Sequence, residues 1–295
     1  MGHGSYSAAD WSKLRSSRQL SQTKKVEETF VRKSCDPKFD PRYIATRECF
    51  DSEDHPNATP IVVGLDVTAS MGYLAVKVAS EALNELIMKL YSTNSIEDPA
   101  LMCAAYVDYF DQSPLQVTQF ESDIRIVEQL LELYFENGGQ GEVVPTCLWH
   151  FLSNHTNIDA VNKRNQKGFV FTIGDEAQIR NSPSLCQVIQ RVIGDQTNAV
   201  NPEEVLKKAE EKFHLFHIMI GGDNAYNRQL MNGHAMSIQK ADVDLIPQII
   251  ISTIQLQKGM ERETVLAQWD ALDRPRLDNI LSQLQFRTEK RGFCL

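Results

Sequence analysis

An apolar run is followed by three side chains that carry oxygen atoms and lie at alternate positions. Residues 61–65 are apolar or glycine, and Asp66, Thr68 and Ser70 come after them. A short continuous apolar run is typical of a strand buried on both faces of a parallel sheet. Open α/β sheets bind ligands beyond the carboxyl ends of such strands. Carboxylate and hydroxyl oxygens are hard donors, so the pattern indicates a site for Mg²⁺ or Mn²⁺ rather than for zinc.

Strands and helices alternate along the rest of the chain. Buried strands are predicted at residues 101–107, 168–174 and 213–220, with residues 115–120 as the hairpin partner of the first and a weak edge strand at 234–238. Apolar residues at helical spacing predict helices near residues 74–91, 123–134, 185–192, 202–212 and 242–256. This order predicts an α/β fold of the Rossmann-like type: three layers, with a mostly parallel central sheet, helices on both faces and one antiparallel edge hairpin.

The pattern Asp66-x-Thr68-x-Ser70 resembles the metal-ion-dependent adhesion site of von Willebrand factor A domains, where Asp-x-Ser-x-Ser is usual. That family completes its site with a threonine from a glycine-flanked loop and an aspartate that ends a later central strand. In this sequence Thr146 follows a glycine-rich segment, and Asp175 ends the strand at residues 168–174. The resemblance covers roughly residues 57–256, implies the same Rossmann-like sheet, and implies a metal site made of Asp66, Thr68, Ser70, Thr146 and Asp175.

Some of these residues also have a plainer interpretation. The segment before Thr146 departs from the Gly-x-Thr form that is commonest in the family, so Glu142 could take its place as the ligand. Thr146 could then simply cap its helix. Asp66 and Asp175 could likewise be turn residues at strand ends, with the two hydroxyls capping the next helix.

Two extensions flank the predicted domain at residues 57–256. Residues 1–56 are polar and rich in turn formers, which predicts an N-terminal arm that is flexible over residues 1–25 and packs on the domain from about residue 37. Residues 257–295 carry apolar residues at helical spacing. They predict a helical extension that packs on the domain.

Composition excludes several classes of function. The net charge of −9 over 295 residues argues against nucleic-acid binding as the main task. No apolar run approaches the ~20 residues that span a bilayer, so no membrane association is expected. The first residues lack the basic and apolar regions of a signal peptide, and the six cysteines are scattered. A cytoplasmic protein with reduced thiols is therefore expected.

The resemblance implies a function in binding. In such sites hydroxyls bind the ion directly while the carboxylates mostly act through water, so the ion keeps an open position that an acidic residue of another protein can fill. We therefore expect a cytoplasmic adaptor that is not an enzyme and binds a partner protein through Mg²⁺ or Mn²⁺. Residues 64–72 and the lack of a signal peptide are similar to intracellular bacterial or phage members of the family. Such members often work beside AAA+ ATPases of the MoxR type, which makes an ATPase the expected partner.

Two other classes of function remain open at this point. The chain could be a structural assembly subunit whose metal site is vestigial and whose arms do the binding. It could also be a metal-dependent hydrolase or phosphoryl-transfer enzyme that uses Asp66 or the same ion, with Asp175 and Glu176 as the available bases.

Overall fold

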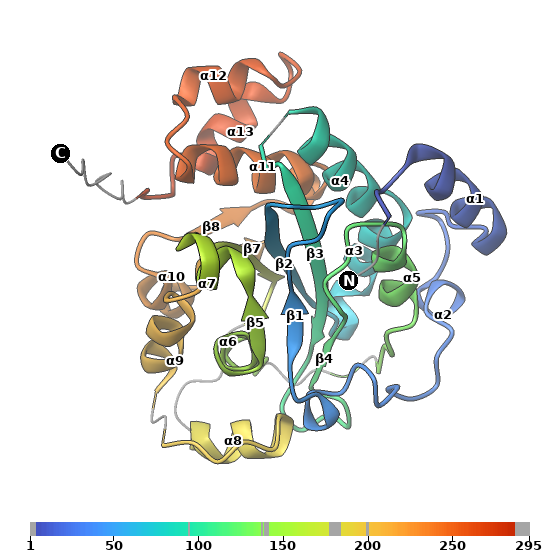
Figure 1. The fold of residues 1–295 in the computed structure, drawn as a ribbon, viewed down its shortest axis with the longest axis vertical. Coiled ribbons are helices and arrows are strands. Elements are labelled where there is room, and N and C mark those ends of the chain that lie inside the picture. The colour runs from blue at the N-terminus through green and yellow to red at the C-terminus, as the bar shows by residue number, and fades with distance from the viewer. Residues whose placement is uncertain are drawn as a thin grey trace.

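A six-stranded sheet forms the centre of the computed structural model, which describes residues 4–93, 95–136, 138, 142–176, 184–198 and 201–286 (Figure 1). Its strands are β2 (Ala58–Asp66), β3 (Asp98–Tyr106), β4 (Leu115–Val117), β6 (Gly168–Gly174), β7 (Phe213–Ile220) and β8 (Ala235–Ile238). They lie in the order β4-β3-β2-β6-β7-β8, and all neighbours are parallel except the antiparallel pair of β3 and β4. The predicted mostly parallel sheet with one antiparallel edge hairpin is confirmed.

Helices cover both faces of this sheet. One face carries α3 (Gly72–Lys77), α4 (Leu83–Ser92), α5 (Arg125–Leu131) and α11 (Ile246–Gln257), with a π-helical stretch, Val78–Ala82, between α3 and α4. The other face carries α6 (Pro145–Asn154), α7 (Asp159–Arg164), α8 (Leu185–Val192), α9 (Pro202–Ala209) and α10 (Ala225–Met231). The three-layer architecture is therefore the predicted one. No helix in the described ranges is long and apolar enough to cross a membrane.

A second, two-stranded parallel sheet pairs β1 (Arg47–Cys49) with β5 (Thr156–Ile158). The sequence did not predict it, because three-residue strands are too short to show a periodic pattern. Single-turn 3₁₀ helices lie at Pro41–Tyr43 and Ala69–Met71, and a longer one at Lys240–Leu245.

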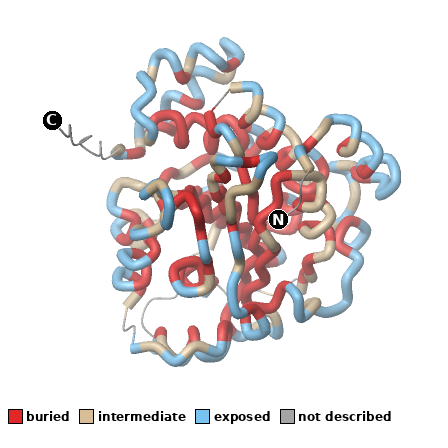
Figure 2. The backbone as a smooth tube through the Cα atoms, viewed as in Figure 1, coloured by how far each residue is buried: buried red, intermediate tan, exposed pale blue. Residues whose placement is uncertain are grey.

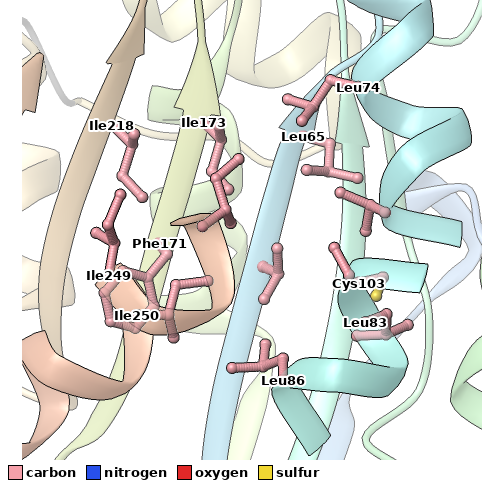
Figure 3. Close-up of a cluster of buried hydrophobic side chains, with 14 of the residues drawn as sticks. Leu65, Leu74, Leu83, Leu86, Cys103, Phe171, Ile173, Ile218, Ile249 and Ile250 are labelled. Carbon is pink, nitrogen blue, oxygen red and sulfur yellow. The ribbon is translucent and has the colours of Figure 1, made fainter. Parts of the chain in front are cut away.

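Side-chain alternation along β2 divides the core in two. Val63 and Leu65 pack in the cluster under α3, α4 and α11, where Figure 3 shows Leu65 beside Leu74. Val62 belongs to the cluster on the opposite face, beneath α6. Figure 2 shows these buried strands as the interior of the molecule. Because successive side chains of a strand point to opposite faces, Asp66 lies on the face of Val62, which α6 covers.

The N-terminal segment, for which the sequence predicted a flexible arm over residues 1–25, contains two helices. Residues 8–18 form a helix, α1 (Ala8–Arg18), whose N-cap is Ser7, and a short helix α2 (Val26–Thr29) follows. Trp11, Leu14 and Leu20 are buried in the main core, and Arg15 of α1 forms an ion pair with Glu81 of the π-helical stretch at 3.6 Å. The apolar residues of this segment are too sparse to form a helical stripe, so α1 depends on contacts with the domain for its stability.

The C-terminal helices α12 (Arg262–Ala267) and α13 (Arg274–Leu281) also pack on the domain. Val265, Trp269 and Leu277 join the same core as α11, and the Trp269 indole N–H donates to Ser252 Oγ at 2.8 Å. Leu284 and Phe286 also pack against this core. Residues 287–295 lie outside the described part of the chain.

Replacement of Trp11 by alanine tests whether the N-terminal segment belongs to the core. We expect Trp11→Ala to lower the free energy of unfolding by about 3–5 kcal/mol, because the buried indole would leave a cavity. The measurement is urea unfolding, with Lys13→Ala as the control on the same helix, since 80% of the Lys13 side chain is exposed. Equal stability of the two variants would show that α1 does not contribute to the core.

Candidate metal centre

Asp66 ends β2 with a fully buried carboxylate whose two oxygens differ in their partners. Oδ1 accepts hydrogen bonds from the Thr68 backbone N–H at 2.9 Å and from Thr68 Oγ1 at 2.7 Å. Oδ2 is buried with no hydrogen-bond partner among the described residues. A buried carboxylate oxygen without a partner is costly, so this oxygen is suited to a cation or a proton.

The hydroxyl groups connect Asp66 to Asp175. Thr68 Oγ1 lies 3.3 Å from Ser70 Oγ, and Ser70 Oγ donates to Asp175 Oδ1 at 3.1 Å. A hydroxyl has only one hydrogen. When those of Thr68 and Ser70 bond the two carboxylates, only lone pairs remain between the two hydroxyl oxygens. The structure therefore brings together four of the five predicted ligands, and it leaves two of their oxygens facing each other as a cation would require.

The backbone brings the start of α6 to the same edge of the sheet. The Val144 N–H donates to the carbonyl of Val107, just after β3, and the Val67 N–H donates to the carbonyl of Tyr106. Thr146 is the second residue of α6 and is fully buried. Glu142 is exposed, and its backbone N–H donates to Asp108 Oδ1 at 3.0 Å. Both residues thus lie on the segment that borders the site, and the choice between them as a ligand stays a prediction.

Tyr106 is a residue of this site that the sequence analysis missed. It sits on β3, yet its hydroxyl donates to the carbonyl of Ile173 on β6 at 2.9 Å, so the side chain crosses β2. Gly64 lies under this crossing: a Cβ there would lie 2.7 Å from Leu148 Cδ2 on α6, which would have to shift, and 3.4 Å from Tyr106 Cε1, which is van der Waals contact. A glycine inside a strand often marks such a close approach, and that signal was available in the sequence.

Gly174 gives Asp66 its space on the other side. A Cβ at Gly174 would lie 2.8 Å from Asp66 Cβ and 2.9 Å from Asp66 Oδ2. The last residue of β6 must therefore be a glycine for the carboxylate to lie where it does. Asp175, the next residue, accepts the hydrogen bond of Ser70.

The electrostatics of this edge favour a cation. Burial raises the pKa of Asp66 from 3.8 to about 7, an effect that the Thr68 hydrogen bonds oppose and the charges of Asp175 and Glu176 reinforce. Burial also raises the pKa of Glu176, with further contributions from Asp175 and Asp108. Asp108, which is fully buried, also follows an apolar strand. A bound divalent cation would favour the ionised form of each carboxylate.

The residues at this edge fit a hard divalent cation. Within the described ranges no three histidine, cysteine, aspartate or glutamate side chains are arranged to hold a metal ion. A cation here would therefore depend on the hydroxyls of Thr68 and Ser70 as well as on carboxylates. Such an all-oxygen set suits Mg²⁺ or Mn²⁺.

The pKa of Asp66 predicts how stability depends on pH when metal is removed. Since its folded-state pKa of about 7 lies above the ordinary 3.8, the ionised carboxylate destabilises the fold. The free energy of unfolding should therefore fall as the pH rises from 3.8 to about 7, and this loss should be complete above that range. Its size is on the order of 4 kcal/mol.

Urea unfolding in EDTA, at several pH values, checks this against Asp66→Asn. The asparagine keeps an oxygen for the Thr68 bonds but cannot ionise, so we expect the variant to gain stability over the wild type as the pH rises. A stability difference that does not change with pH would contradict the raised pKa.

No protein-family model and no curated protein matches the chain. Among solved structures, it is similar to the pilus adhesin SpaC from Lactobacillus rhamnosus GG, with a TM-score of 0.48 and 11% identity over 70% of this chain and 31% of that one. A von Willebrand factor type A protein from Catenulispora acidiphila has a TM-score of 0.43 and 11% identity over 67% and 42% of the two chains. Proximal thread matrix protein 1 from the mussel byssus, solved with a zinc-occupied MIDAS motif, has a TM-score of 0.44 and 14% identity over 66% and 47%.

The fold class is defined by this chain's own sheet order and helix layers. A mostly parallel sheet with β2 at its centre, one antiparallel edge strand and helices on both faces is a von Willebrand factor A-like arrangement.

Proposed function

We propose that this chain is a protein-interaction module that binds an acidic residue of a partner through a divalent cation held by Asp66, Thr68, Ser70 and Asp175. The observation that carries the proposal is the buried Oδ2 of Asp66, which has no hydrogen-bond partner among the described residues. The other oxygen of this carboxylate begins a series of hydrogen-bonded hydroxyls that reaches the surface at Ser70. When bound, Mg²⁺ or Mn²⁺ would supply an open coordination position for a carboxylate of the partner.

Each residue has a definite role in this proposal. Asp66 accepts the hydrogen of Thr68, and Asp175 accepts that of Ser70, so both hydroxyl oxygens direct lone pairs toward the site. Ser70 is exposed, which makes the site accessible to another molecule. The fifth ligand would be Thr146 or, in its place, Glu142.

An exposed aromatic residue borders the same site. Tyr73 lies in α3, three residues after Ser70, and 42% of it is exposed. The charge of Asp175 is one of the causes that raise the pKa of its phenol, after burial, so the two side chains are near each other. Tyrosine is enriched at protein interfaces, where its ring supplies contact area and its hydroxyl supplies a hydrogen bond. Tyr73 is therefore a contact residue in the proposed interface.

The finer parts of the proposal rest on the resemblance of residues 64–72 to intracellular bacterial or phage members of the von Willebrand factor A family. By this resemblance the chain acts in the cytoplasm as an adaptor rather than an enzyme, and its partner is an AAA+ ATPase of the MoxR type. The carboxylates support a binding role, since Asp66 and Asp175 are engaged in orienting hydroxyls.

Calorimetric titration with Mg²⁺ and Mn²⁺ tests the site. We expect saturable binding by the wild type, weakened at least about tenfold in Ser70→Ala, because one neutral oxygen ligand is lost. Ser92→Ala is the matched control: Ser92 is also exposed and lies at the end of α4, in the helical segment that follows the site. Absence of ion binding by the wild type, or equal affinity in both variants, would contradict the proposal.

Affinity capture in Mg²⁺ and in EDTA tests the interaction. We expect a partner that is retained in Mg²⁺ by the wild type and Ser92→Ala, and lost in EDTA or with Ser70→Ala. An AAA+ ATPase among the retained proteins would support the finer proposal. A partner that is retained equally in EDTA and by Ser70→Ala would instead favour an assembly subunit that binds through other surfaces.

A further inference from the structure

A chain of buried polar side chains leads from the core to the turn that carries Asp175. It consists of Thr172 on β6, His217 on β7 and Asn227 on α10, and each side chain is at most 1% exposed. Thr172 Oγ1 lies 2.8 Å from His217 Nδ1, and Asn227 Nδ2 lies 3.2 Å from His217 Nε2. Buried polar groups are costly unless they are bonded, so this chain needs an explanation.

The positions of the hydrogens in this series of buried side chains can be assigned. The Asn227 amide nitrogen has hydrogens to donate and no acceptor lone pair, so His217 Nε2 must be the acceptor. The imidazole then carries its hydrogen on Nδ1 and donates it to Thr172 Oγ1, which donates to the carbonyl of Phe216 at 3.4 Å. Burial lowers the pKa of His217 to about 4, in agreement with a neutral ring. The hydrogen bonds of this series thus all run in one direction, from the Asn227 donor toward the acceptor carbonyl on β7.

Asn227 also reaches the candidate metal centre. Its Nδ2 lies 3.4 Å from the carbonyl of Glu176, the residue after Asp175. The amide orientation is fixed by this contact, because a flipped side chain would place its oxygen against that carbonyl. On the other side of Asp175, Tyr106 donates to the carbonyl of Ile173. The end of β6 is therefore held from β3 on one side and from α10 on the other.

We propose that Asn227 is a positioning residue for the metal centre: through the Glu176 carbonyl it fixes the turn that aims Asp175 at Ser70. This inference rests on the proposed metal-binding function. The Asn227 bonds of 3.2 and 3.4 Å are long, so they contribute little net stability. Their effect is to determine where the Glu176 carbonyl lies. His217 acts one step further back, since it holds the Asn227 amide in the orientation that makes this contact.

Mg²⁺ affinity of Asn227→Leu tests the positioning role. Leucine has a similar size but no donor, and we expect an affinity about tenfold weaker, as for other residues that orient metal ligands. The control is Leu230→Ala, which removes a buried side chain from the same helix without touching the turn. We expect this control to lose stability and keep its Mg²⁺ affinity.

A double-mutant cycle separates positioning from general destabilisation. If Asn227 acts through Asp175, then adding Asn227→Leu to Asp175→Asn should cause little further loss of affinity. Unchanged affinity in Asn227→Leu, or fully additive losses in the double variant, would overturn the inference while wild-type binding still supports the proposed function.

Hydrogen exchange in EDTA keeps the inference testable without any metal. We expect Asn227→Leu to accelerate amide exchange in peptides that contain residues 174–176, with no such local change in Leu230→Ala. Unchanged exchange at residues 174–176 would overturn the inference. Failure of the wild type to bind Mg²⁺ would contradict only the proposed function, since this local effect concerns the metal-free chain.

Discussion

The buried carboxylate of Asp66 is the constraint on which the geometry of this edge depends. It lies at the end of the central strand, with one oxygen bonded by Thr68 and the other without a partner in the described structure. Gly174 leaves it the space it needs, and Tyr106 crosses the same strand and donates to the carbonyl of Ile173 at the end of β6. Each of these features keeps the Asp66 carboxylate buried and in one orientation.

The same constraint connects the architecture to binding. A buried carboxylate that is bonded by Thr68 through one oxygen alone, among other acidic groups, is unfavourable in isolation and favourable beside a cation. The exposed Ser70 brings this chemistry to the surface, where another protein can reach it. The mostly parallel sheet contributes by ending β2, β3 and β6 at one edge, which collects residues distant in the sequence.

Much of this could be predicted from the sequence, because strand ends carry a strong signal. The apolar runs before Asp66 and Asp175 indicated the central strands, and the parallel arrangement then placed both carboxylates together. Tyr106 and Asn227 could not be found in this way, since their roles depend on contacts across strands and between layers. Trp11 was missed for a similar reason: one aromatic residue in a polar segment shows no periodicity, although it is buried against the domain.

Diffraction from crystals grown with Mn²⁺, with the anomalous signal measured near the manganese edge, tests the central claim most directly. We expect one anomalous peak among Thr68, Ser70 and Asp175, about 2.0–2.3 Å from the two hydroxyl oxygens, as is usual for hard divalent cations. A structure in which this position has no peak, with Thr68 and Ser70 still bonded to their carboxylates, would contradict it.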